Sequence, residues 1–375
     1  MRAETFVDSH GHKRQVSLRE LDWLMAAVVA LCCLGLVIAV SVQGPGRGPL
    51  QALKGQGSKL MLGLVAFLLC STLPLHRLRQ IAWPAFLSAT GLCLVAALFF
   101  RTSKGAARWI RITDSLTFQP VEIARFLMIV LVATVVADLG DDIRRFRGGF
   151  LKVMGPPLLL AGALVAQPDL GNAIFTVALA ATMAIAAGVR WRYFASAGLI
   201  LFAGVVWHVS RRSYAQDRLH GFLDVDPAGQ VGQSLTAIAS GGIFGQGLGS
   251  GWMKMGFVPE AANDFVFAVI GEELGLLGSL LVLGLYTVIG LAGYRLALAT
   301  EDRFLKLLVI GFSIAICMQA AINLLVVTGL APAKGIDLPF LSSGGTNLMF
   351  ALAAVGLLGN AARAGVTARA TSWRE

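Results

Sequence analysis

The chain has 375 residues, of which 56% are hydrophobic and only 14% are charged, and its mean hydropathy is +0.74. A soluble globular domain of this length does not normally have this balance, so the composition predicts a polytopic membrane protein. The formal net charge is +10. Most basic residues lie in the polar gaps between apolar runs, so this charge indicates membrane topology, and we expect no nucleic-acid partner.

No cleavable targeting segment is expected at the start of the chain. The polar stretch 1–21 is too long and too acidic for the n-region of a signal peptide, and no convincing cleavage site follows it. The five cysteines lie in apolar runs with neither disulfide nor metal-ligand spacing, so we interpret them as small hydrophobic residues.

Apolar runs of spanning length predict an all-α fold with ten transmembrane helices in one domain, residues 22–362. The expected helices cover residues 22–42, 59–73, 81–100, 119–138, 150–166, 171–188, 194–209, 264–292, 304–328 and 345–362. A large loop, residues 210–263, separates the seventh and eighth helices. Because it is too long for a plain connector, we expect it either to contain short helices or to cover a site.

The distribution of Lys and Arg predicts the orientation of the helices. Arg144, Arg145 and Arg147 follow the fourth helix, and further basic residues precede the first helix and follow the tenth. This excess favours the cytoplasm, so the terminal segments 1–21 and 363–375 are expected inside and the 210–263 loop outside the cell. A basic loop after the third helix is an exception on the outer side. It either binds something anionic or touches acidic lipid headgroups.

Four of the ten predicted helices begin at the outer face with polar residues. These residues are Gln119, Glu122 and Arg125; Gln167 and Asp169; Glu260 and Asp264; and Ser342, Ser343, Gly344 and Gly345. Four such starts on one face predict a functional site there.

Each of these polar groups has two interpretations from the residues alone. Glu122 and Arg125 share a helical face, and they form either a structural ion pair or a substrate contact. The serine–glycine run 342–345 offers N–H groups to a phosphate, or its serines cap the helix. Asp264 is either a helix cap or an acid of the site.

Glu272 and Glu273 follow Asp264 within the same apolar run. On a straight helix Glu272 would lie about 12 Å below Asp264, towards the membrane interior. A water-soluble reacting group would not reach that depth, so we expect both glutamates to pair with polar groups of neighbouring helices.

Several motifs resemble one known family in the order in which they occur along the chain. GAARWI (Gly105–Ile110), QPVEIAR (Gln119–Arg125), QPDLGN (Gln167–Asn172) and the segment Asn323–Asn347 are similar to signatures of the SEDS family, the shape, elongation, division and sporulation proteins that include RodA and FtsW. The resemblance spans nearly the whole chain.

The resemblance implies a ten-helix peptidoglycan glycosyltransferase in the bacterial cytoplasmic (inner) membrane. Such an enzyme polymerises lipid II at the outer face of that membrane, with a class B penicillin-binding protein as partner and membrane lipids around it. The family's essential aspartate falls on Asp264, which would activate the 4-hydroxyl of the acceptor sugar as general base or position it. No side chain is an evident covalent nucleophile, so we expect direct displacement with inversion.

We predict that a wider set of residues binds the substrate. The set is Arg101, Arg108, Trp109, Gln119, Glu122, Arg125, Asp169, Gln233, Ser234, Lys254, Glu260, Ser342, Ser343, Gly344 and Gly345. Among them, Arg101, Arg108, Lys254 and the start of the tenth helix are candidates for the diphosphate. No cofactor or metal cluster is evident, and a divalent cation held mainly by the diphosphate would leave little trace in the sequence.

The sequence also departs from the family pattern. Asn263 stands for the usual Thr before the aspartate, Ser343 for the usual Tyr, and Thr346 and Asn347 for a Ser-Ser pair. These departures keep two other hypotheses open. The chain could move a lipid-linked precursor across the membrane as a flippase, or it could be a cell-wall scaffold without activity of its own.

Overall fold

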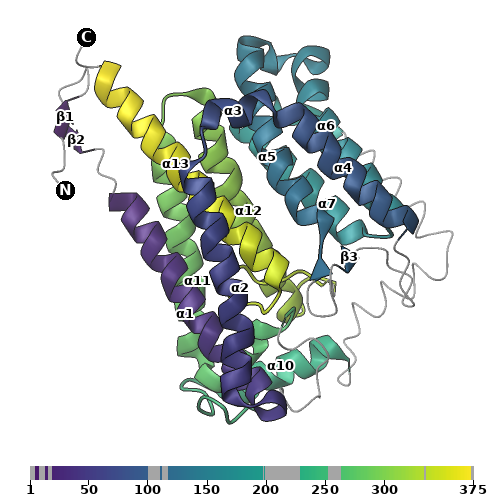
Figure 1. Ribbon diagram of the computed structural model, residues 1–375, viewed down its shortest axis with the longest axis vertical. Coiled ribbons are helices and arrows are strands. Elements are labelled where there is room, and N and C mark those ends of the chain that lie inside the picture. Colours follow the sequence, from purple (N-terminus) through teal and green to yellow (C-terminus); the bar gives the residue numbers. More distant parts are fainter. Residues whose placement is uncertain are drawn as a thin grey trace.

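The computed structural model describes residues 5–7, 13–15, 19–99, 110–111, 117–196, 198, 229–251, 263–332 and 335–372. Within these residues, eight helices are long and apolar enough to cross a membrane. The prediction of an all-α membrane protein is therefore confirmed. Figure 1 shows the helices as one bundle, with the beginning of α1 and the end of α13 at the same end of the molecule and α10 at the opposite end.

Nine of the ten expected helices have a counterpart in the described part of the chain. They are α1 (Arg19–Arg47), α2 (Pro49–Thr72), α4 (Ala82–Phe99), α5 (Pro120–Leu139), α6 (Leu151–Ala166), α7 (Leu170–Ala186), α11 (Val266–Ala299), α12 (Arg303–Val327) and α13 (Gly345–Ser372). The expected seventh helix, 194–209, lies mostly outside the described residues. The second helix was predicted to begin at residue 59, but α2 begins at Pro49 and includes a polar first part.

Short elements connect the long helices. They are α3 (Leu75–Gln80), the 3-10 helix η1 (Gly140–Arg144), the π-helix η2 (Phe146–Phe150) and α10 (Gln230–Gly241). Strand β1 (Thr5–Val7) pairs antiparallel with β2 (Lys13–Gln15), and β3 (Ile110–Arg111) pairs antiparallel with β4 (Thr117–Phe118). Because α10 lies within the 210–263 loop, the expectation that this loop contains a short helix is confirmed.

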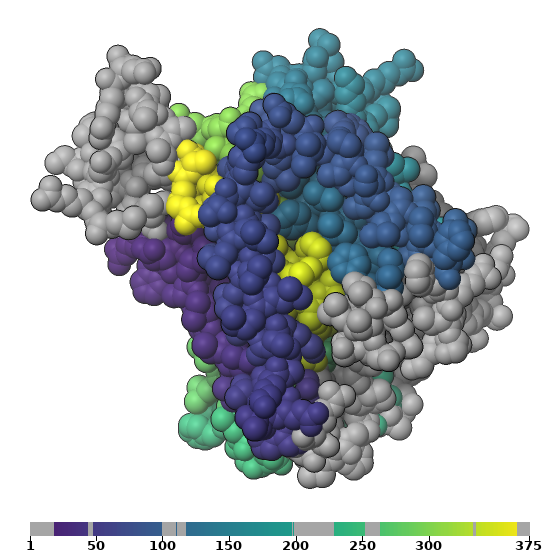
Figure 2. Space-filling model, viewed as in Figure 1, coloured from purple at the N-terminus to yellow at the C-terminus, as the bar shows by residue number. Residues whose placement is uncertain are grey.

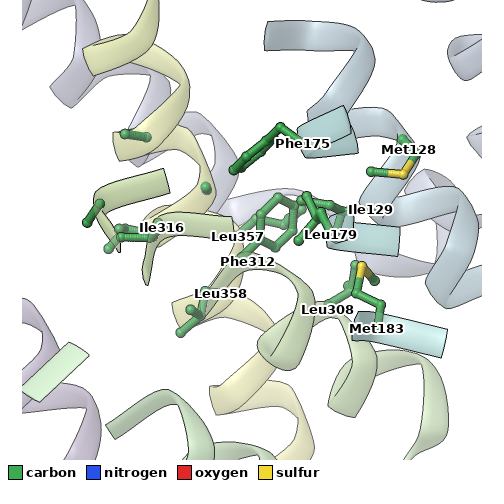
Figure 3. Packing of buried hydrophobic residues seen from close by; sticks show 14 of the residues in the cluster. Met128, Ile129, Phe175, Leu179, Met183, Leu308, Phe312, Ile316, Leu357 and Leu358 are labelled. Atoms are coloured by element: carbon green, nitrogen blue, oxygen red, sulfur yellow. The ribbon is translucent and has the colours of Figure 1, made fainter. Parts of the chain in front are cut away.

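The core lies where α5, α7, α12 and α13 meet (Figure 3). Phe312 of α12 is buried there, and its ring centroid lies 4.9 Å from that of Phe126 of α5. Phe175 and Met183 of α7 are also buried in this cluster. Lipid tails are as apolar as these side chains, so close packing, more than removal from water, holds such helices together.

Helices α2 and α13 run side by side because glycines allow close contact. A Cβ atom at Gly356 of α13 would lie 2.4 Å from the carbonyl oxygen of Phe67, and one at Gly63 of α2 would lie 2.5 Å from a methyl carbon of Leu352. Small residues at such positions let helix backbones approach in a membrane. This packing brings the start of α13 beside the third turn of α2.

The eighth predicted helix was expected to be continuous, and this expectation is wrong. Helix α11 is broken at Gly275, whose φ of 66° and ψ of −159° are not helical. The backbone N–H of Leu276 donates to Gly242 in the glycine-rich run after α10, at 2.9 Å. The N–H groups of Gln246 and Gly247 in that run donate to the carbonyls of Glu272 and Glu273, both at 3.0 Å. The run therefore satisfies backbone groups that the break would otherwise expose.

The two glutamates before this break are buried. The hydroxyl of Ser41 in α1 donates to both carboxylate oxygens of Glu273, at 2.6 and 2.7 Å. This contact confirms the predicted pairing of Glu273 with a polar group of a neighbouring helix. Ser41 lies in the last two turns of α1, which ends at Arg47 and leads into α2. Glu273 thus lies near the end of α1. The depth of Glu272, about 12 Å below Asp264 on a straight helix, stays a prediction.

Candidate active site

Asp264 lies in the turn that precedes α11, and it is partly exposed. The side-chain amide of Asn323 in α12 donates to the backbone carbonyls of Asp264 and Ile336, both at 2.7 Å. A Cβ atom at Gly335 would lie 2.8 Å from a carboxylate oxygen of Asp264. The carboxylate therefore rests against the beginning of the segment that leads into α13, and we name residues 335–345 the α13 entry loop.

Two serines of the entry loop bind the residue before Asp264. The hydroxyl of Ser342 donates to the backbone carbonyl of Asn263 at 2.6 Å and accepts from the N–H of Leu338 at 2.7 Å. The hydroxyl of Ser343 donates to the side-chain oxygen of Asn263 at 2.5 Å. Ser342, Ser343, Gly344 and Gly345 thus lie together with Asp264, as the sequence predicts, but the two hydroxyls hold the turn and are not free for a phosphate.

Lys59 and Asp337 also lie at the start of α13, although neither is among the predicted site residues. The Lys59 ammonium donates to the backbone carbonyl of Ser343 at 2.6 Å. A Cβ atom at Gly344 would lie 2.3 Å from a carboxylate oxygen of Asp337. Lys59 is the first residue of the predicted second helix. Its charge at the end of an apolar run could have indicated the site, because a charge in such a helix needs a partner or has a function.

The entry loop is held in a strained conformation. Phe340 has a φ of 67°, which is unfavourable for a residue with a side chain, and it is 2% exposed. The Tyr286 hydroxyl of α11 donates to the Pro339 carbonyl at 2.5 Å. A Cβ atom at Gly35 of α1 would lie 2.6 Å from the Phe340 carbonyl oxygen. Such strain costs about 1–3 kcal/mol, so contacts from several helices are needed to maintain it.

A second polar cluster lies between α5 and α7. Arg125 contacts Glu122 at 3.4 Å, donates to the side-chain oxygen of Asn172 at 2.5 Å and stacks on the ring of Phe175. The two charged side chains of the pair are 6% and 12% exposed. Asp169 is buried, caps α7 and accepts from Asn172. The ion pair and the cap are both present, but Glu122 and Arg125 also line a pocket.

This pocket joins the second cluster to the α13 entry loop. Its volume is about 40 Å³, and its polar lining residues are Glu122 and Arg125 of α5, Gln319 of α12 and Asn347 of α13. Gln319 donates to the backbone carbonyl of Asp337 at 2.9 Å and to the side-chain oxygen of Asn347 at 3.1 Å. Figure 2 shows side chains of α13 in the gap between α2 and the helices that follow it.

The other predicted substrate ligands have different outcomes. Gln119 is partly buried at the start of α5, and Gln233 is partly buried on α10. Ser234 is fully buried, and its hydroxyl donates to the carbonyl of Val327 at the end of α12, at 2.8 Å. Because this hydroxyl is inaccessible, we do not retain Ser234 as a substrate ligand. Arg101, Arg108, Trp109, Lys254 and Glu260 lie outside the described residues.

In the part of the chain that the structure describes, no group of three or more His, Cys, Asp or Glu side chains could hold a metal ion. Asp264 contacts the entry loop at Gly335, and Asp337 lies within that loop against Gly344, but they do not form such a group. The described residues therefore offer two carboxylates and one ammonium around the start of α13, without a protein-built metal site.

Comparison with known proteins places the chain among cell-wall proteins. The model of the FtsW/RodA/SpoVE family, described as "Cell cycle protein", matches residues 22–366. A "Probable peptidoglycan glycosyltransferase FtsW" of Geobacter sp. (strain M18) is 34% identical over 359 residues, which cover 92% of this chain and 97% of that protein. "Stage V sporulation protein E" of Bacillus subtilis is 38% identical over 264 residues, 69% of this chain and 72% of that protein.

Solved structures share the fold. One, described as "Structural coordination of polymerization and crosslinking by a peptidoglycan synthase complex", has a TM-score of 0.78 and 29% identity, and the match covers 91% of this chain and 97% of that one. The rod shape determining protein RodA of Thermus thermophilus has a TM-score of 0.67 and 26% identity, with 91% and 96% covered. From the family model and these relatives together, the chain belongs to the FtsW/RodA/SpoVE family.

Proposed function

We propose that the chain is a peptidoglycan glycosyltransferase that polymerises lipid II at the outer face of the bacterial cytoplasmic membrane. The names of its relatives support this class of activity. The observation that carries the proposal for this chain is the position of Asp264. Its partly exposed carboxylate lies against the α13 entry loop, and the Asn323 amide fixes the Asp264 backbone.

The proposed reaction uses Asp264 as the base. The 4-hydroxyl of the acceptor sugar attacks the anomeric carbon of the donor, and the bond from that carbon to the diphosphate oxygen breaks. The hydroxyl proton passes to the Asp264 carboxylate, and the lipid diphosphate leaves. Attack opposite to the leaving group inverts the anomeric carbon. Of the predicted cations for the leaving group, Arg101, Arg108 and Lys254 remain proposals outside the described residues.

The pocket between α5, α12 and α13 is the proposed position for part of the substrate. Its polar side chains, Glu122, Arg125, Gln319 and Asn347, come from three helices and face one space. Ligand pockets commonly combine an apolar lining with a few convergent polar groups, and this one also has the side chains of Phe126, Phe312 and Phe350. Glu122 and Arg125 would then orient a sugar, while their mutual pairing keeps both stable.

A class B penicillin-binding protein is the proposed partner. A solved structure of similar fold belongs to a complex that couples polymerisation with crosslinking, which supports such a partner. Transport of a lipid-linked precursor is the less favoured function. Transport would need a polar path across the membrane, and its candidates are Glu122, Arg125, Glu272 and Glu273. Among them, Glu122 pairs with Arg125 and Glu273 with Ser41.

The direct test measures glycan strands formed from lipid II by the purified full chain with the class B penicillin-binding protein of its organism. Asp264→Ala and Asp264→Asn are expected to lower the rate at least about 100-fold, because the base is lost. Asp302→Asn, at a helix cap outside the site, is the matched control and should keep the wild-type rate. Strands that form equally fast with Asp264→Ala would refute the assignment of Asp264.

A further inference from the structure

Lys59 is a partly buried, positively charged residue that has no role in the reaction proposed above. It lies in the third turn of α2, and its ammonium donates to the Ser343 carbonyl at 2.6 Å. Its aliphatic stem packs against the start of α13, since a Cβ atom at Gly345 would lie 3.3 Å from the Cγ atom of Lys59. The ammonium is therefore aimed at the positive end of a helix, where an anion would be stabilised by both.

Hydrogen bonds connect this ammonium to the base. The Ser343 residue that accepts from Lys59 also donates to Asn263, the neighbour of Asp264. Asn323, which binds the backbone of Asp264 itself, provides a second observation beside the base. Its side chain is 2% exposed, its amide N–H groups bind the carbonyls of Asp264 and Ile336, and its side-chain oxygen has no hydrogen-bond partner in the described structure. A buried acceptor without a donor indicates a place for a ligand hydroxyl or water.

We propose that Lys59 binds the diphosphate of the lipid-linked sugar at the start of α13. This inference rests on the proposed function, and it adds a residue that the motifs do not contain. The N–H groups at the first turn of α13 and the ammonium would share the negative charge of the leaving group. Asp337 should act in the opposite direction, because its carboxylate lies against Gly344 and repels an anion there.

A purely structural Lys59 would have a different signature. If the ammonium served only to hold the Ser343 carbonyl, its loss would lower the melting temperature and reduce kcat without a specific effect on diphosphate ligands. If Lys59 binds the diphosphate, its substitution instead changes KM, and the size of this change depends on the charge of the new side chain. Removing the charge of Lys59 then raises KM, and removing the charge of Asp337 lowers it. The charge-conserving Lys59→Arg variant should recover most of the wild-type KM.

The first experiment measures KM and kcat for lipid II with the full chain and its penicillin-binding partner. Lys59→Gln is expected to raise KM about tenfold, the usual effect of losing one charge-assisted hydrogen bond. Asp337→Asn is expected to lower KM severalfold. Lys152→Gln removes an exposed lysine on α6 as the matched control, and KM should not change. An unchanged KM in Lys59→Gln, or a rise in KM in Asp337→Asn, would overturn the proposal.

The second experiment measures binding without turnover, so that it remains decisive if the polymerase proposal fails. The probes are undecaprenyl diphosphate and undecaprenyl monophosphate, each titrated into the full chain in detergent. Wild type should prefer the diphosphate, and Lys59→Gln should lose about tenfold of that preference while Lys59→Arg keeps it. An equal preference in wild type and Lys59→Gln refutes the role of Lys59, whereas a wild type that binds selectively but forms no strands refutes only the polymerase.

Discussion

At the scale of single residues, two departures from the family motif bind each other. Asn263 replaces the usual Thr and Ser343 the usual Tyr, and the Ser343 hydroxyl donates to the Asn263 side chain at 2.5 Å. Each residue alone reads as a lost motif position, but together they link the turn before α11 to the start of α13. The departures therefore keep Asp264 against the entry loop by a different contact and do not by themselves argue for an inactive scaffold.

The hydrogen bonds of the Asn323 side chain predict the effect of removing its amide. Asn323→Ala leaves the partly buried carbonyls of Asp264 and Ile336 without their donor, which costs about 1–3 kcal/mol in total. We expect a lower melting temperature and, well below that temperature, a lower kcat, because the turn that carries Asp264 is no longer fixed. Both are measured on purified protein with lipid II.

Asn360→Ala is the matched control for this prediction. The Asn360 amide also joins two carbonyls, those of Cys70 and Leu73, at 3.2 and 2.8 Å, but far along α13 from its start. Its loss should lower the melting temperature and leave kcat unchanged. If both variants lowered kcat equally, the role of Asn323 would be general stability and not alignment of Asp264.

At the scale of elements, the glycine-rich run and the break in α11 form one unit. The run supplies donors and acceptors to α11 on both sides of Gly275, and Gly275 itself has a positive φ. A Cβ atom at Gly245 would lie 2.2 Å from the carbonyl oxygen of Glu273. Gly241 and Gly245 must therefore be glycine because the two backbones touch at these positions.

Alanine substitutions at two glycines of this run distinguish the effect of steric contact from that of backbone strain. Gly242 and Gly245 both have positive φ, but only a Cβ atom at Gly245 meets neighbouring backbone. Gly242→Ala should cost about 1 kcal/mol of stability from its φ alone, and Gly245→Ala clearly more. Amide exchange of Gln246 and Gly247, whose N–H groups bind α11, should accelerate mainly in Gly245→Ala. Equal melting temperatures for the two variants would contradict this packing.

At the scale of the whole molecule, the sequence predicts the helices better than their contacts. Long apolar runs located nine helices because a bilayer requires them, and the motifs led to Asp264. The role of Lys59 was not predicted, because its contact with Ser343 joins residues that are far apart in the chain. The break at Gly275 was not predicted, because its backbone partners come from a separate loop.

Orientation is the last property of the whole molecule that the site requires. Under the proposed function the lipid II headgroup is bound outside the cytoplasm. The proposal therefore predicts that the α13 entry loop faces outward and that the basic residues around η1 and η2 face inward. Gln51 is exposed near the start of α2, and Arg147 is exposed in η2, which follows α5 and η1. Figure 1 shows that α2 starts at the lower end of the bundle and that α5 ends at the upper end. In a variant without its native cysteines, a membrane-impermeant maleimide applied to cells with a permeabilised outer membrane should label Gln51→Cys and spare Arg147→Cys. Lysed cells should show both labelled. The reverse pattern would put Asp264 on the cytoplasmic side, where polymerisation of exported lipid II is impossible.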